Sequence, residues 1–293
     1  MRIGEKIKKL RTAKVMTQSE LAGTHITRNM LSCIENGSAQ PSLGTVMYLA
    51  ERLNVSPGYL LANEGDEQIY LKHNHIMSIK KAFLNGDYQI CRDICKNIED
   101  STDDEIYLIL CEATLHMGIE EFNRGNLRSA CNFFDEALEH CAKTIYYTGN
   151  VLSIIGSYFH YMRNISATLG SNMIDESEIS LFSGLSEEFP RYVVLFENSE
   201  KGGNLSVLYT ELSLAADSPL GWHLEARRQM KEERFQDAYE NLHRILVEDR
   251  PIPEPVLYFV FCDLEICCKE IEDYKGAYEY ASAKLEILQK LLS

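Results

Sequence analysis

Short apolar stripes separated by polar turns run through the first 62 residues. Ile3, Ile7 and Leu10 recur at helical spacing, and Leu31 and Ile34 do so again further along. A longer stripe follows at Leu43, Val46, Leu49, Ala50 and Leu53. Helices this short are marginal in water on their own. The pattern therefore predicts five short helices that hold one another in a compact unit.

Local start and stop signals indicate where the helices in the middle of this unit begin and end. In "TQSELAG", Thr17 can cap a helix and Glu20, three residues later, completes a capping box. Gly23 can end that helix with a left-handed residue. Thr27 opens the next helix, and "NG" at residues 36–37 stops it. Two short helices joined by a tight turn form a helix-turn-helix arrangement.

The outer face of the second helix carries side chains that suit base reading. Because Leu31 and Ile34 point inward, the opposite face of this helix points outward. These outward residues are Arg28, Asn29, Ser32 and Cys33. Arginine can contact guanine through two hydrogen bonds, asparagine can do the same with adenine, and serine suits either base.

Five runs carry a resemblance to a known family. "IGEKIKKLR", "TQSELA", "TRNMLSCIENG", "PSL" and "LNVSPGYLL" resemble the phage-repressor (Xre/Cro) type of DNA-binding domain, although the turn "GTHI" is about one residue shorter than the commonest family pattern. The resemblance implies that residues 27–36 are the recognition helix and that Arg11 and Glu35 form a structural ion pair. The implied DNA contacts, to bases or phosphates, are Thr17, Gln18, Thr27, Arg28, Asn29, Ser32, Cys33, Asn36 and Ser38.

Charge separates this head from the rest of the chain. Residues 1–65 contain eight Lys or Arg and five Asp or Glu, a net charge of +3, whereas the remainder carries −18 of the total −15. An acidic body does not bind nucleic acid by itself, and a weakly basic head binds only weakly as one copy. Small modules of this kind usually bind palindromic half-sites as dimers. We therefore expect a homodimer on a double-stranded, palindromic operator.

Residues 66–293 read as helices throughout, because Leu, Ile, Tyr, Phe and Ala recur there at spacings of three and four. Four segments share a turn residue, then an aromatic residue or leucine, and then a small residue three positions later. The small residues are Cys91, Ala130, Ala238 and Ala277, which lie 39, 108 and 39 positions apart. These intervals are close to one, three and one periods of the tetratricopeptide repeat, about 34 residues long.

The sequence thus predicts an all-α chain with two domains. Residues 1–65 form a five-helix DNA-binding domain of Xre type, and residues 66–293 form a tetratricopeptide-like α-solenoid. In such repeats the small residues let two antiparallel helices approach closely, and large residues fill the gap to the next pair. A generic helical bundle is the alternative for the second domain.

Catalytic and metal-binding motifs are not evident in the sequence. The nine cysteines include no CxxC pair, and HExxH, P-loop and Gly-rich dinucleotide motifs are missing. We expect a protein that is not an enzyme, with no cofactor, no metal and mostly buried free cysteines. A zinc site that includes His73 or His75 and a hydrolase-like helical body are the alternatives. No signal peptide and no apolar run of 18 residues is present, so we expect a cytoplasmic protein without a membrane span.

An Xre-type head followed by a tetratricopeptide-like body resembles the Rgg/PlcR-type (RRNPP) group of bacterial regulators. The resemblance implies that the repeat domain forms a homodimer and binds a short signalling peptide on its concave face, which changes DNA binding. The alternative is a repressor whose repeat domain docks a protein partner and has no small effector. Because repeats host many functions, the body resemblance concerns architecture.

One helical face between residues 147 and 164 suits an extended peptide. Asparagine both donates and accepts hydrogen bonds, and tyrosine supplies an apolar wall with a hydroxyl. The candidate peptide-binding residues are Tyr147, Asn150, Ile154, Tyr158, Tyr161, Arg163 and Asn164. Of these, Arg163 could pair with a peptide carboxylate. The alternative is that the tyrosines belong to the core of the repeats.

Overall fold

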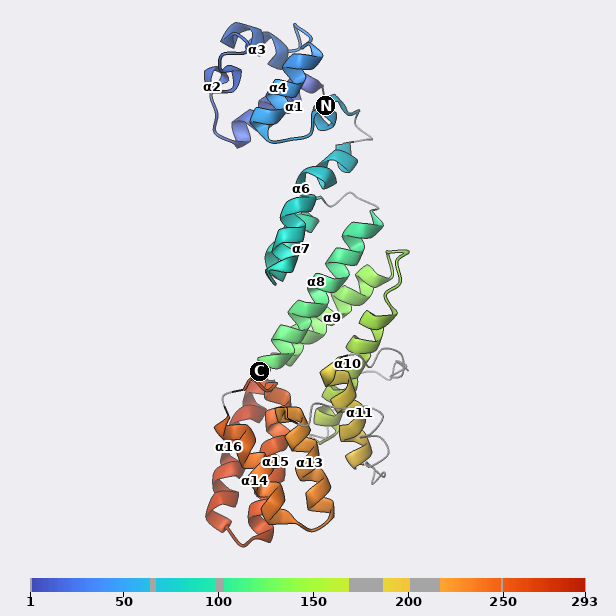
Figure 1. The fold of residues 1–293 in the computed structure, drawn as a ribbon, viewed down its shortest axis with the longest axis vertical. Coiled ribbons are helices and arrows are strands. Elements are labelled where there is room, and N and C mark those ends of the chain that lie inside the picture. Colours follow the sequence, from blue (N-terminus) through green and yellow to red (C-terminus); the bar gives the residue numbers. More distant parts are fainter. Residues whose placement is uncertain are drawn as a thin grey trace. The chain divides into compact units, whose positions relative to one another are not determined.

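The computed structural model describes residues 2–63, 67–98, 103–168, 187–200, 217–248 and 250–292, and the regular elements in these ranges are helices (Figure 1). The all-α prediction is confirmed. The chain divides into two compact units, Met1–Ile106 and Tyr107–Ser293. The sequence boundary predicted after residue 65 lies within the first of them, which we call the N-terminal unit; the second is the C-terminal unit.

The N-terminal unit begins with the five predicted helices. These are α1 (Ile3–Ala13), α2 (Gln18–Ala22), α3 (Arg28–Glu35), α4 (Leu43–Leu53) and α5 (Pro57–Leu61). The capping box at α2 is confirmed, since the Thr17 hydroxyl accepts from the Glu20 N–H and the Glu20 carboxylate accepts from the Thr17 N–H. A mainly aliphatic core joins the helices, with Leu21, Leu31 and Leu49 fully buried.

Two further helices, α6 (Glu67–Leu84) and α7 (Tyr88–Lys96), complete the N-terminal unit. Tyr70 packs on the core of the first five helices. At Gly58 an added Cβ would lie 2.2 Å from the Tyr70 ring, so α5 and α6 are in close contact. The Ser56 N–H also donates to the Asn74 side chain at 2.8 Å. These contacts explain why α6 belongs to the same unit as the five-helix domain.

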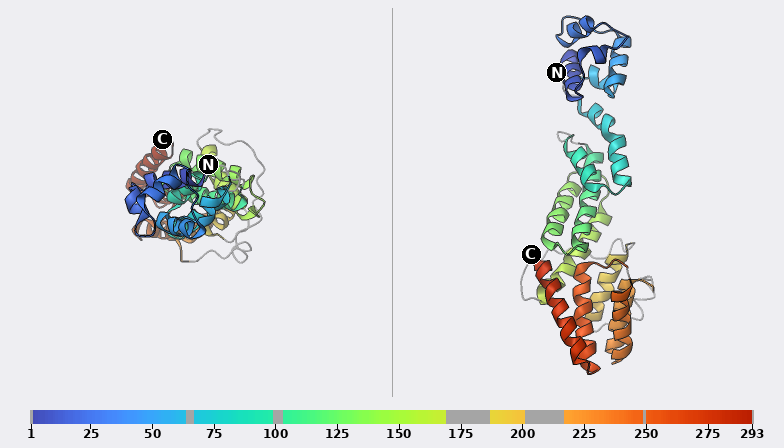
Figure 2. Two further views of the ribbon diagram at one scale, coloured as in Figure 1. Left: turned by 90° about the horizontal axis from the view of Figure 1, so that it is seen from above. Right: turned by 90° about the vertical axis from the view of Figure 1, so that its left-hand side faces the viewer.

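The C-terminal unit consists of helices joined mostly by short turns. They are α8 (Asp104–Asn123, whose first turn lies in the N-terminal unit), α9 (Leu127–Cys141), α10 (Gly149–Thr168), α11 (Glu188–Glu200), α13 (Pro219–Lys231), α14 (Phe235–Val247), α15 (Glu254–Glu270) and α16 (Tyr274–Leu292). The last four, coloured orange to red, lie side by side (Figures 1 and 2). This is the arrangement of stacked helix pairs that the repeat pattern predicts.

Small residues lie where the helices of a pair meet. Ala130, Ala238 and Ala277 are all buried. A Cβ atom added at Gly118 of α8 would lie 2.6 Å from the Phe134 ring of α9, so only glycine permits this approach. The tetratricopeptide-like packing predicted from these positions is confirmed.

Aromatic rings fill the centre of the C-terminal unit. Tyr158 stacks on Phe189 with ring centroids 4.5 Å apart, and Phe196 meets Phe259 edge-to-face at 5.0 Å. Tyr161 is fully buried among the same rings. Such pairs contribute beyond the apolar area that they bury.

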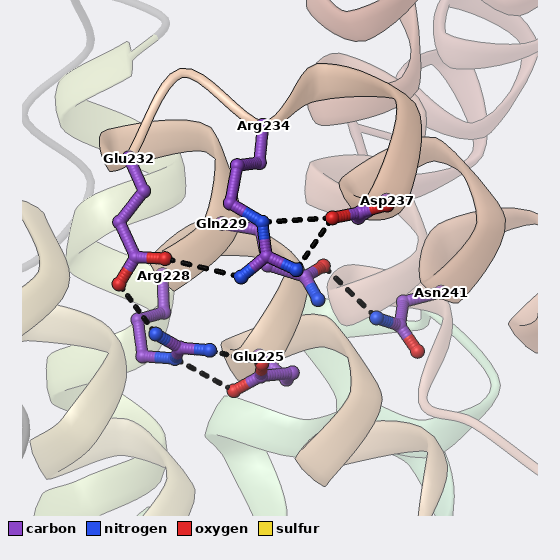
Figure 3. A network of polar contacts seen from close by, with 7 residues as sticks. All are labelled: Glu225, Arg228, Gln229, Glu232, Arg234, Asp237 and Asn241. Carbon is purple, nitrogen blue, oxygen red and sulfur yellow. Dashed lines mark hydrogen bonds and ion pairs between the residues drawn. The ribbon is translucent and has the colours of Figure 1, made fainter.

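Exposed charges link the ends of α13 and α14 (Figure 3). Arg228 pairs with Glu225 and Glu232, and Arg234 donates to Asp237 at 2.7 Å. Exposed ion pairs of this kind contribute little to stability because water screens them. The pair of helices is therefore held mainly by its buried face, not by this network.

Candidate nucleic-acid interface and inner pocket

Backbone contact sets the position of α3, the predicted recognition helix. A Cβ atom added at Gly4 of α1 would lie 2.0 Å from the Ile34 carbonyl oxygen. Glycine is therefore required for α1 to pack directly on the backbone of α3. Leu31 and Ile34 are buried beneath the helix, and the Thr27 hydroxyl caps its start by accepting from the Met30 N–H at 3.1 Å.

A buried carboxylate clamps α1, α2 and α3 together. Arg11 donates to both oxygens of Glu35, at 2.6 and 3.0 Å, which confirms the predicted ion pair. Gln18 donates to the same carboxylate at 2.8 Å, and Arg11 also reaches the Met16 carbonyl. Burial alone would raise the pKa of Glu35, but the hydrogen bonds from Arg11 and Gln18 outweigh it and lower that pKa.

Side chains of α4 support the turn between α2 and α3. Gly23 has a φ of 55°, and an added Cβ there would lie 2.3 Å from the Tyr48 hydroxyl. Tyr48 donates to the Ala22 carbonyl at 3.0 Å, and the His25 ring stacks on it with centroids 4.4 Å apart. Sequence reasoning missed Tyr48, because it lies 26 residues beyond the carbonyl that it binds.

The predicted base-reading face is available to solvent. Arg28, Asn29 and Cys33 are exposed, and Ser32 is half-buried. At the end of α3, the Ser38 hydroxyl donates to the Cys33 carbonyl at 3.0 Å, and Asn36 is exposed. Thr17 is exposed and Gln18 half-buried at the start of α2. The structure brings all nine predicted DNA-contact residues into one helix-turn-helix element; which of them contact DNA stays a prediction.

A pocket of about 460 Å³ lies in the C-terminal unit; we call it the inner pocket. One face of α8 forms a wall through residues spaced three or four apart: Glu112, Leu115, His116, Ile119 and Asn123. Ile154 and Tyr158 of α10 and Phe189 of α11 supply further apolar and aromatic surface. Prolines at 190, 219, 251 and 253 lie around it. Pockets of this size accommodate small ligands or a few residues of a peptide.

Two polar side chains of α8 are partly desolvated in the inner pocket. Burial raises the pKa of the Glu112 carboxyl. Burial lowers the pKa of His116, and the nearby Glu120 and Glu187 carboxylates only partly counter that shift. Glu187 and Glu188, at the start of α11, add two more carboxylates to the lining. Sequence reasoning missed these residues because their convergence depends on how α8, α10 and α11 pack.

The predicted peptide-binding residues, which lie on α10 or just before it, have different environments. Ile154 and Tyr158 line the inner pocket, whereas Tyr161 is fully buried in the aromatic core. Tyr147 and Asn150 are exposed. At the other end, Arg163 contacts His160 at 2.7 Å and Asn164 donates to Glu197 at 3.4 Å. The stripe thus passes from solvent along the pocket to the buried Tyr161 and ends at exposed Arg163. Peptide contact by these residues stays a prediction.

Within the described ranges, no group of three or more His, Cys, Asp or Glu side chains is placed to hold a metal ion. None of the described helices combines the length and continuous apolarity that a membrane span requires.

Several solved structures show low similarity to this chain. One is PlcR of Bacillus thuringiensis in complex with the peptide PapR7 and DNA, at 14% identity and a TM-score of 0.29, over 99% of this chain and 96% of that one. Another is ComR of S. thermophilus in complex with DNA and its signalling peptide ComS, at 18% identity and a TM-score of 0.25, over 97% and 99%. A mutant of PrgX shares 14% identity at a TM-score of 0.31, over 96% and 100%.

The sequence match to a known family lies in the N-terminal domain. No curated protein matches the chain at a significant level. Residues 4–66, however, match the family model of a helix-turn-helix domain, and this range contains α1 to α5 with the clamp and the exposed face of α3. The N-terminal domain of this chain therefore belongs to the helix-turn-helix domains, a class of DNA-binding modules.

Proposed function

We propose that the chain is a sequence-specific transcriptional regulator that reads an operator with α3. The observation that carries this proposal is the exposed polar face of a helix fixed by the Arg11–Glu35 clamp. Arg28 and Asn29 provide donors and acceptors for base edges at the start of that helix. The phosphate contacts come from Thr17 and the segment at residues 36–38.

Binding-site selection from a random duplex pool tests this proposal with the full-length chain. Arg28→Ala and Asn29→Ala should each weaken binding to the selected site by about 1–3 kcal/mol and relax specificity at one position. Arg128→Ala is the charge-matched control, since Arg128 is exposed on α9 outside the domain. Unchanged binding by both α3 variants at constant salt would show that α3 is not the reader.

We further propose that a short peptide is the effector and that it binds along α10 and the inner pocket. The pocket supports this because it combines apolar walls with a few polar groups, as ligand sites do. Asn150 serves the peptide backbone at the exposed end of the stripe, and Arg163 serves a carboxylate at the other.

Asn150→Ala and Arg163→Ala test the peptide proposal. Because both side chains are exposed, either variant should keep its melting temperature and its peptide-free DNA binding while losing the response to the peptide. Leu152→Ala is the control on the same helix, since Leu152 is 42% exposed and lies outside the pocket lining. A normal response in both variants would move the site elsewhere. Binding of a protein, with no peptide response at all, would favour the partner-docking alternative.

We propose that α16 contributes to a homodimer. Its exposed apolar residues include Tyr278 at 76%, Leu285 at 55% and Leu292 at 54%, and Leu288 lies between them half-buried. Spacings of seven, three and four place these residues on one stripe. Light scattering should give a dimer for the wild type and a monomer for Leu285→Glu. Glu286→Gln, at an exposed position of α16 away from this stripe, is the control. A wild-type monomer at micromolar concentration would exclude the dimer.

A further inference from the structure

The lining of the inner pocket is strongly one-sided in charge. Among the described residues, the lining contains three carboxylates, those of Glu112, Glu187 and Glu188, together with His116 and no lysine or arginine. The pocket is thus more selective than a general apolar groove, because an anionic group placed there would be repelled by the carboxylates.

Local structure explains part of this charge but not all of it. Glu188 begins α11, where a carboxylate is favoured by the helix dipole. Glu112 lies in the middle of α8, far from either end of the helix. It is half-buried, burial raises its pKa, and no ion-pair partner for its carboxylate is found in the described part of the chain. A desolvated carboxylate without a partner is costly, and an incoming cation would relieve that cost.

The rest of the pocket suits the body of a cationic side chain or chain terminus. Leu115, Ile119 and Ile154 can cover an aliphatic stem. The Tyr158 ring, stacked on Phe189, adds an aromatic face of the kind that attracts cations. The volume of about 460 Å³ leaves room for a few residues of a peptide, not for a whole folded partner.

We infer that the inner pocket selects a positively charged group of the effector peptide, either its free amino terminus or a lysine or arginine side chain, by pairing it with Glu112 and Glu187. This inference rests on the proposed peptide-sensing function and names the chemistry of that site. Glu112 lies on α8 and Glu187 directly precedes α11, so the two carboxylates approach the pocket from separate segments. Together they can pair with one ammonium group.

Two random hexapeptide libraries test the inference on immobilised full-length protein. One library has free amino termini, the other has acetylated termini, and mass spectrometry identifies the peptides retained. The wild type should enrich cationic peptides about tenfold over neutral ones, the scale of a close charge pair across a binding surface. Loss of retention in the acetylated library identifies the terminus as the group bound, whereas retained lysine or arginine peptides identify a side chain.

Variants separate the pocket from the overall negative charge of the chain. Glu112→Gln and Glu187→Gln keep the side-chain shape and should each remove most of the cationic preference while apolar preferences remain. Glu279→Gln makes the same change in net charge on α16, outside the pocket, and should behave as wild type. A second measurement needs no variant. Raising the salt concentration should weaken the preference of the wild type for cationic peptides, because salt screens the attraction between charges.

Three results would overturn the inference. If the wild type enriches peptides without regard to charge, the pocket is not selective for cations although peptide sensing stands. If the glutamine variants keep the cationic preference, the cation binds elsewhere. If no peptide is retained from either library, the proposed peptide sensing fails and the inference fails with it.

Discussion

The two units bury their charges in different places. In the N-terminal unit, the Arg11–Glu35 pair lies at the edge of a mainly aliphatic core, with Arg11 still 11% exposed. In the C-terminal unit, Asp263 lies within the aromatic core and accepts from His223 at 2.9 Å and from Arg227 at 2.7 Å. His223 is fully buried and in turn contacts the Tyr192 hydroxyl at 2.9 Å.

This difference follows from what each unit presents to solvent. A clamp at the edge fixes the angle between short helices and leaves the outer face of α3 available. A network at the centre satisfies polar groups that would otherwise be orphaned between large rings. We therefore expect damage to the clamp to affect DNA reading first, and damage to the network to affect the folding of the C-terminal unit.

Asp263→Ala should have the largest effect. Removing the carboxylate takes away the acceptor that buried His223 and Arg227 share, which costs about 3–5 kcal/mol of unfolding free energy. Trp222, the single tryptophan, is 3% exposed in α13 and reports unfolding of the C-terminal unit by fluorescence in denaturant. Hydrogen exchange in α1 to α5 should stay as in the wild type. A loss below 1 kcal/mol would show that the network does not stabilise this unit.

Gly4→Ala should have the second largest effect. The added methyl group meets a backbone oxygen that cannot rotate away, so α1 and α3 must separate, at a cost of about 1–3 kcal/mol. Faster hydrogen exchange in α3 and weaker operator binding would measure it. Gly44→Ala is the control, because its added methyl group meets only the Ser42 hydroxyl at 3.9 Å and alanine favours a helix. Equal behaviour of the two variants would contradict the close packing.

The clamp predicts a pH effect in the N-terminal unit. The pKa of Glu35 is lower in the folded state than its unfolded value, which is about 4.3. Glu35 therefore contributes stability above that unfolded value, and the contribution is lost as the pH falls through the lower folded pKa. Between about pH 5 and 2, the protection of the α3 amides, taken relative to the intrinsic exchange rate at each pH, should fall more in the wild type than in Arg11→Gln. Parallel profiles would show that the pair does not lower the Glu35 pKa.

Arg234→Ala should have the smallest effect. Its bonds to Glu232 and Asp237 are exposed, and water replaces them readily (Figure 3). The tryptophan-detected midpoint should match that of the wild type within error. A clear decrease would mean that the exposed network, and not only the buried face, holds α13 to α14.

Local signals in the sequence were reliable wherever the structure depends on neighbours in the chain. Thr17 and Thr27 cap the helices that they were expected to begin. The ion pair of Arg11 with Glu35 also followed from family resemblance. The small residues of the repeats were found because their spacing repeats, and each one is buried at a helix contact.

Features that depend on packing between distant parts of the chain could not be predicted from the sequence. One stripe on α10 reads as uniform in sequence, yet its members differ from exposed Asn150 to fully buried Tyr161. Periodicity gives the direction of a side chain but not what lies opposite it. The grouping of α6 with the five-helix domain likewise depends on Tyr70 and Asn74. Both contact residues of that domain, although the composition of the chain changes between the two segments.

The sequence by itself determined the all-α class, the five-helix head with its exposed face on α3, and the paired helices of the body. These features follow from caps, turns and periodic apolar residues, which act over one or two helices. Only the tertiary structure decided the buried Asp263 network and the acidic inner pocket. Both join residues from several helices, and the relative placement of those helices is set by the shapes of the packed rings and small residues between them.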